Sequence, residues 1–137
     1  MISAVVGSKE VLGLFRPGEH GSTFGGMPLS CAVSREALRV LVDEDLTGRA
    51  ERLGARLRDG LRAIRCDQVK EVRGKGLLLA MEFKSGPRTA RGVCEALQRE
   101  GILCKETHET TVRFAPPLII TESEIDLIIA AAKKVLE

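Results

Sequence analysis

The residues with the clearest chemical potential lie in one glycine-rich stretch, Gly-Glu-His-Gly-Ser-Thr-Phe-Gly-Gly at residues 18–26. Ser22 and Thr23 offer two neighbouring hydroxyl groups, and the glycines let the backbone approach a bound group closely. Pro28 suits the first turn of a following helix, whose unpaired N–H groups would face the same point. The stretch therefore predicts a phosphate-binding loop, although its composition alone is equally compatible with a simple connector.

A second candidate is Arg113, which lies in the stretch Thr-Val-Arg-Phe-Ala-Pro-Pro-Leu at residues 111–118. The planar guanidinium of arginine can form two parallel hydrogen bonds with a carboxylate and so fix the orientation of a substrate, which lysine cannot do. An exposed arginine on a strand, without any ligand, is the alternative reading of the residue type alone.

The remaining reactive side chains indicate no catalytic group and no metal site. Glu19 with His20, and His108 with Glu109, are adjacent pairs in loops that lack the spaced partners of a zinc site or a nucleophile triad. Lys75 is expected at the surface. The cysteines are widely separated and are expected to be reduced, with Cys104 a small buried apolar residue: Cys31, Cys66, Cys94 and Cys104.

Composition excludes several classes of function. The 137 residues suffice for one domain with a largely aliphatic core, since aromatic residues make up only 3%. Acidic and basic residues are intermixed with a net charge of +2 and there is no Trp or Tyr, which disfavours nucleic-acid binding. The apolar stretches are too short to span a bilayer, and no signal peptide is evident. A cytoplasmic protein is the expectation, unless a targeting segment has been lost.

Hydrophobic periodicity predicts an order of strand, helix, helix, two strands, helix, two strands and helix. A brief helical turn is also expected between residues 8 and 15. The strands are expected at residues 2–6, 69–73, 77–83, 102–105 and 111–114, the second and third pairing as a hairpin around Gly-Lys-Gly. The long helices are expected at residues 28–44, 46–64, 90–100 and from a Thr121–Glu124 capping box to the C-terminus. The only boundary falls near residue 44, because residues 45–137 alone have enough elements for a core.

Three motifs together resemble class III pyridoxal-phosphate aminotransferases, closest to the ornithine aminotransferases. They are the loop at residues 17–29, Val-Arg-Gly-Lys-Gly-Leu-Leu at residues 72–78, and Val-Arg-Phe-Ala-Pro-Pro-Leu at residues 112–118. They occur in the family's order, and the similarity runs from Ile2 to Glu137. It covers only the last third or so of such an enzyme.

The resemblance implies an α/β fold, namely the C-terminal part of a fold-type I transferase. Residues 1–44 would end the large cofactor domain, and residues 45–137 would form a small α+β domain whose short mixed or antiparallel sheet has helices on one face. Exposed apolar surface is then expected at residues 2–6 and on the helix from Pro28, where the large domain would pack.

The resemblance also implies roles for single residues. Thr23, assisted by Ser22, would bind the phosphate of pyridoxal 5'-phosphate across a dimer interface, and Arg113 would bind a substrate carboxylate. Met27 departs from the family pattern, which has asparagine there. No catalytic residue is assigned, because the Schiff-base lysine and the aspartate at the pyridine nitrogen belong upstream of Ile2.

The implied reaction moves the terminal amino group of ornithine to 2-oxoglutarate, giving glutamate semialdehyde and glutamate. The isolated chain is expected to be inactive, and the partners would be a second subunit or a missing N-terminal portion. An acetylornithine aminotransferase and a non-catalytic domain that binds a partner subunit are the alternatives. The compartment could be the mitochondrial matrix if a targeting segment was lost.

Overall fold

The computed structural model describes residues 3–137, which fall into two compact units divided between Glu44 and Asp45. The assignment of the first to a large cofactor domain and of the second to a small C-terminal domain remains a prediction.

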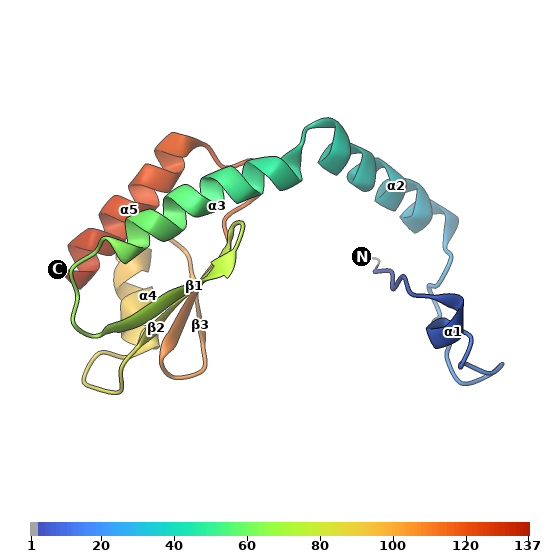
Figure 1. Cartoon of the computed structure of the whole chain (residues 1–137), viewed down its shortest axis with the longest axis horizontal. Coiled ribbons are helices and arrows are strands. Elements are labelled where there is room, and N and C mark those ends of the chain that lie inside the picture. The colour runs from blue at the N-terminus through green and yellow to red at the C-terminus, as the bar shows by residue number, and fades with distance from the viewer. Residues whose placement is uncertain (1–2) are drawn as a thin grey trace. The chain divides into compact units, whose positions relative to one another are not determined.

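The first unit contains two helices, α1 (Lys9–Leu12) and α2 (Pro28–Asp43), joined by the glycine-rich loop (Figure 1). The prediction of α2 and of Pro28 in its first turn is confirmed. The predicted strand at residues 2–6 is wrong for residues 3–6, and Ile2 lies outside the described residues. The physical reason is that a strand needs a hydrogen-bonded neighbour, and residues 3–44 contain no other strand.

Apolar side chains of the first unit are largely open to solvent. No residue of α2 is buried, and Leu29 and Val33 are 70% and 60% exposed. The segment before α1 is similarly open, with Val6 95% exposed. The expected apolar surface on this unit is therefore present, and packing within the unit contributes little to its stability.

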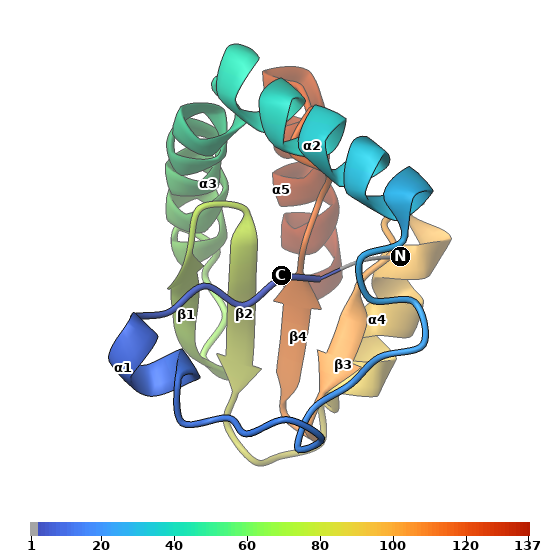
Figure 2. The ribbon, with the colours of Figure 1, turned by 90° about the vertical axis from the view of Figure 1, so that its right-hand side faces the viewer.

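The second unit is built on a four-stranded antiparallel sheet in the order β1-β2-β4-β3 (Figure 2). Its strands are β1 (Val69–Lys75), β2 (Leu78–Phe83), β3 (Lys105–Thr107) and β4 (Thr111–Phe114). The predicted β1–β2 hairpin is confirmed, and its turn uses positive φ angles of 136° at Gly74 and 53° at Gly76.

Helices α3 (Leu46–Arg62), α4 (Ala90–Arg99) and α5 (Glu122–Leu136) cover one face of this sheet (Figure 2). Each begins at a side-chain cap: Asp45 accepts from the Gly48 amide, Thr89 accepts from the Gly92 amide, and Thr121 forms the predicted capping box with Glu124. The predicted α/β arrangement, with helices on one face, is confirmed.

The strand predicted at residues 102–105 lies instead at β3, so that only Lys105 was placed correctly. The cause is the end of α4. Gly101, at φ 83°, donates to Gln98, and the Ile102 N–H donates to the Leu97 carbonyl at 2.9 Å. Ile102 thus completes the helix terminus, and Leu103 is 83% exposed.

The core of the second unit follows the two periodicities of its elements. In β2 the alternate side chains of Leu79, Met81 and Phe83 are buried toward the helices, whereas Ala80 and Glu82 lie on the open face. The helices contribute aliphatic side chains to the same core, including Leu57, Leu61, Leu97 and Ile125. This core holds the sheet rigidly, and the open face is where its polar residues are available for chemistry.

Candidate functional site

The predicted phosphate loop lies directly before α2. Ser22 and Thr23 are exposed, and the backbone turns there through a hydrogen bond from the Gly25 N–H to the Ser22 carbonyl, 3.3 Å. A Cβ added at Gly21 or Gly26 would meet nothing within 4 Å, so there is open space beside the loop. Among residues 3–137, neither hydroxyl has a hydrogen-bond partner, which leaves both available to a ligand.

The start of α2 suits an anion. Met27 occupies the N-cap position without a side-chain hydrogen bond, and the first turn contains no acidic residue. The N–H groups of Leu29 and Ser30 precede the first helical hydrogen bond, which the Cys31 N–H donates to the Met27 carbonyl at 3.0 Å. Free hydroxyls, free amides and the positive end of a helix are the donor set that fits a phosphate.

The acidic and aromatic neighbours of the loop have structural partners. The Arg16 N–H donates to the Glu19 carboxylate at 2.6 Å, and the His20 ring lies 5.9 Å from the Phe15 ring, centroid to centroid. The Glu19 carboxylate is therefore held by a backbone N–H, away from the role of repelling an anion bound in the loop. Both residues were predicted to be structural or exposed, and both are.

Arg113 lies on β4, on the open face of the sheet. Its direct neighbours in the register are Ala80 on β2 and Lys105 on β3. It lines a hollow of about 330 Å³ together with Arg73, Leu78 and Ala80. Since its side chain is exposed while Val112 and Phe114 are buried on either side, the strand holds the backbone of Arg113 and leaves the guanidinium accessible.

The charges around this hollow are distributed unevenly. The Lys70 ammonium contacts Glu82 at 2.6 Å, while the Arg73 guanidinium contacts Glu82 at 3.1 Å and Glu71 at 2.8 Å. The hydrogen bond from Lys70 lowers the pKa of Glu82 and raises that of Lys70. Among the described residues, neither Arg113 nor Lys105, its register neighbour on β3, has an ion pair, so both charges are open to a ligand.

Sequence reasoning identified Arg113 but missed the charged residues that surround it. Lys70, Arg73 and Glu82 belong to no motif that indicates an anion site, and only the register of β1 against β2 brings them together. Thr23 lies in the first unit and Arg113 in the second.

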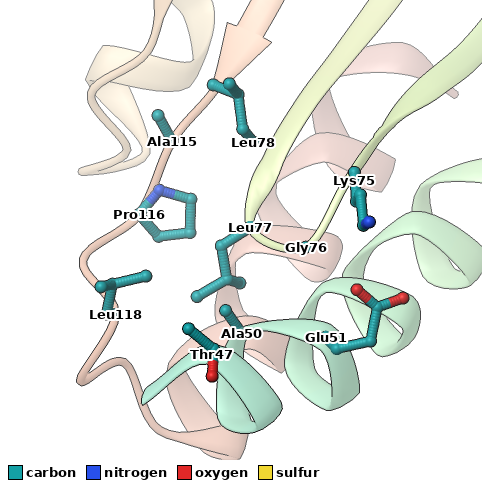
Figure 3. A pocket seen from close by; sticks show the side chains of 10 residues that line it. All are labelled: Thr47, Ala50, Glu51, Lys75, Gly76, Leu77, Leu78, Ala115, Pro116 and Leu118. Atoms are coloured by element: carbon teal, nitrogen blue, oxygen red, sulfur yellow. The ribbon is translucent and has the colours of Figure 1, made fainter. Parts of the chain in front are cut away.

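A second hollow, of about 370 Å³, lies at the turn of the β1–β2 hairpin and shares Leu78 with the first (Figure 3). The start of α3, the turn of the hairpin and the segment after β4 form its walls. Figure 3 shows Leu77, Leu78, Pro116 and Leu118 contributing apolar surface, with Lys75 and Glu51 at one side. The hollow marks where Ala115 and Pro116, which follow the Arg113 strand, approach the glycine turn.

The cysteines are free, and two of them are neighbours. Cys94 on α4 and Cys104 before β3 line one small hollow of about 160 Å³. Burial, with the neighbouring Cys94 thiol adding to it, raises the pKa of Cys104 to about 12, and burial also raises the pKa of Cys94. Both thiols are therefore neutral, poor nucleophiles, which agrees with the apolar role expected of Cys104.

Two further observations bound the chemistry of residues 3–137. No helix there is long and apolar enough to cross a membrane. Nor does that part of the chain bring together three His, Cys, Asp or Glu side chains that could hold a metal ion.

The fold and these motifs are similar to those of aminotransferases of known structure. The family model for class III aminotransferases matches residues 1–136, and the chain belongs to this family.

Among curated relatives, ornithine aminotransferase 2 of Staphylococcus aureus (strain N315) is 53% identical over 136 residues, which are 99% of this chain and 34% of the relative. Ornithine aminotransferase of Geobacillus sp. (strain WCH70) is 51% identical over 134 residues, 98% of this chain and 33% of the relative. The chain thus spans about a third of the length of the curated relatives it matches.

Solved structures agree with this family. The acetylornithine aminotransferase of Elizabethkingia anophelis has a TM-score of 0.83 at 41% identity, with 93% of this chain and 33% of that one covered. The ornithine aminotransferase of Toxoplasma gondii has a TM-score of 0.84 at 46% identity, covering 93% and 31%. That structure, crystallised in the presence of oxidised glutathione, has partial occupancy of pyridoxal phosphate at its active site.

Proposed function

We propose that this chain supplies the phosphate-binding loop and the carboxylate-binding arginine of an ornithine aminotransferase, which moves the terminal amino group of ornithine to 2-oxoglutarate and forms glutamate semialdehyde and glutamate. The observation that supports this most directly is Arg113, an accessible guanidinium on a rigid strand without an acidic partner among residues 3–137. The identity of 53% to an ornithine aminotransferase adds to it.

The residues of the loop would hold pyridoxal 5'-phosphate by its phosphate. Ser22 and Thr23 would donate hydroxyl hydrogen bonds, and the helix start after Met27 would add amide donors. When bound, the cofactor supplies the electron sink that amino-group transfer requires. Thr23 would serve the site of a neighbouring subunit in a homodimer.

Arg113 would bind and orient the substrate. Two parallel hydrogen bonds from its guanidinium fix a carboxylate in the plane of the group, so the reacting end of the amino acid or 2-oxo acid is held in one direction. The side chains of Leu78 and Ala80 give the same hollow apolar surface beside that contact. The lysine that binds the cofactor covalently and the aspartate at its ring nitrogen would come from a segment outside this chain, so the chain alone should not turn over ornithine.

Two other functions have specific support. The Elizabethkingia anophelis enzyme, at 41% identity, favours acetylornithine as a second candidate for the amino donor. The exposed apolar side chains of α2 and an open hollow of about 860 Å³ along it favour a domain that binds a partner subunit without catalysis.

The test is an absorbance titration with pyridoxal phosphate, with this chain alone and mixed with the N-terminal two-thirds of the Staphylococcus aureus relative. A cofactor band that ornithine bleaches, seen only in the mixture, is the expected result, and Thr23→Ala and Arg113→Ala should each weaken it. Arg99→Ala removes another exposed arginine and is the matched control. A folded mixture without any band would refute the enzymatic function. Bleaching by acetylornithine instead of ornithine would identify acetylornithine as the amino donor.

A further inference from the structure

The open face of the sheet presents Glu82 with two arginines at equal offsets. Ala80 pairs directly with Arg73 on β1 and with Arg113 on β4, and Glu82 lies two residues further along the same face of β2. Glu82 is therefore a diagonal neighbour of both guanidiniums, at a separation that long side chains can bridge. Of these two guanidiniums, its carboxylate nevertheless contacts only that of Arg73, at 3.1 Å.

The side on which Glu82 finds its partners is determined by β1, where the register shifts between Val69 and Glu71. In a regular strand, Lys70 and Glu71 would point to opposite faces. The irregularity lets both meet Glu82: Glu71 is its register partner, and the Lys70 ammonium contacts it at 2.6 Å. Bulges of this kind often redirect a side chain next to a functional site.

The resulting network offsets the repulsion between two carboxylates. Glu71 and Glu82 are directly opposite, a pairing of like charges that is unfavourable by itself. Arg73 bridges them, at 2.8 Å to Glu71 and 3.1 Å to Glu82. The Glu82 side chain is only 18% exposed, so its position is well defined.

We propose that Lys70 and Arg73 are positioning residues that hold Glu82 on the β1 side of the sheet and so leave Arg113 free for the carboxylate of an amino acid or 2-oxo acid. This inference rests on the proposed function of Arg113. Without the two cations, Glu82 turns to Arg113 and competes with the substrate carboxylate for the same guanidinium. Arg113 would then form an ion pair with Glu82 of the same sheet in place of the substrate.

The experiment uses the whole 137-residue chain and two NMR readouts, the carboxyl carbon of Glu82 through a pH titration and the Nε–Hε signal of Arg113 through a titration with glutarate. In Lys70→Ala/Arg73→Ala, the pKa of Glu82 should stay below its ordinary range because Arg113 replaces the lost partners. Adding Arg113→Ala should raise it to the ordinary range or above, because Glu71 then lies opposite Glu82 without a cation between them. Glutarate affinity should fall about three- to fivefold in the double variant, the effect expected of one exposed ion pair.

Two controls separate this from a general loss of charge. Arg56→Ala/Lys134→Ala removes two cations from ion pairs with Asp126 and Glu100, and it should leave glutarate affinity unchanged. Adding Glu82→Gln to the Lys70→Ala/Arg73→Ala variant should restore the affinity, which also shows that the variant is folded.

A pKa of Glu82 that becomes ordinary while Arg113 is still present would overturn the proposal, as would an unchanged glutarate affinity. If glutarate fails to shift the Arg113 signal in the unaltered chain, the carboxylate role of Arg113 is refuted, and the proposed function with it. The Glu82 titration decides separately whether Arg113 is the alternative partner.

Discussion

A methyl group at Gly54 should disrupt the close contact between α3 and the turn of the β1–β2 hairpin. Gly54 is buried on α3, and a Cβ there would overlap the carbonyl oxygen of Gly76 and lie 2.8 Å from the Gly76 Cα. The atoms it meets are backbone in a turn that already requires a φ of 53°. They cannot rotate away, so the hairpin or the helix must shift.

The expected size of the effect follows from two opposing terms. Alanine gains about 1 kcal/mol over glycine in a helix, while overpacking a well-packed site costs about 1–3 kcal/mol, and more where backbone has to move. We expect Gly54→Ala to lower the free energy of unfolding by about 2 kcal/mol. With a urea dependence of about 1–1.5 kcal/mol/M for a unit of this size, the midpoint of urea unfolding falls by about 1.5 M.

Gly60 on the same helix is the matched control. A Cβ there meets only the Ile129 side chain, whose terminal atoms can move, so Gly60→Ala should stay within about 1 kcal/mol of the unaltered chain. Equal urea midpoints for the two variants, or a more stable Gly54→Ala chain, would refute the reasoning from close approach.

Three further predictions, two of them substitutions, test other parts of the second unit. Leu57→Ala, at a fully buried core position, should lower the free energy of unfolding by about 2–5 kcal/mol in urea titrations, and a loss below 1 kcal/mol would contradict the packing. Thr121→Ala should lower it by about 1 kcal/mol. The hydrogen bond from the Thr121 N–H lowers the pKa of Glu124. The contribution of Glu124 to the free energy of unfolding is therefore present above pH 4.5 and is lost as the pH falls through the lowered pKa. Calorimetry from pH 7 to pH 3 checks this loss and the effect of Thr121→Ala. The pKa of Cys104 is raised from 9.0 to about 12, so at pH 8 its thiolate should be about a thousandfold less abundant in the folded chain than in the unfolded chain. Equally fast iodoacetamide labelling of folded and unfolded protein would contradict this. The stability that the protonated thiol contributes is full below pH 9 and is lost as the pH rises through about 12.

The elements that could be predicted from the sequence are those specified by local chemistry. The helix from Pro28, the α5 capping box and the β1–β2 hairpin each depend on residues close in the chain, and each is present. The errors arise where distant partners decide. Residues 3–6 have the composition of a strand but no neighbouring strand, and Ile102 is taken up by the end of α4.

The candidate site divides in the same way. Arg113 could be proposed from a short motif, because the chemistry of a guanidinium toward a carboxylate needs only the residue and its exposure. The network of Lys70, Arg73 and Glu82 could not, since it depends on a one-residue irregularity in β1 that no local pattern specifies. Unpaired Arg113 is thus a property of the sheet, not of the motif.

The two parts of the proposed site derive their order from different sources. Arg113 is held by a strand whose neighbours Val112 and Phe114 belong to the core, so its position is fixed before any ligand binds. Thr23 precedes a helix without a single buried residue, so its loop gains order chiefly from what it contacts. Carboxylate binding should accordingly be measurable in this chain by itself, whereas phosphate binding at Thr23 should be weak until another protein surface covers the apolar side chains of α2, because the ligand alone would have to order the loop.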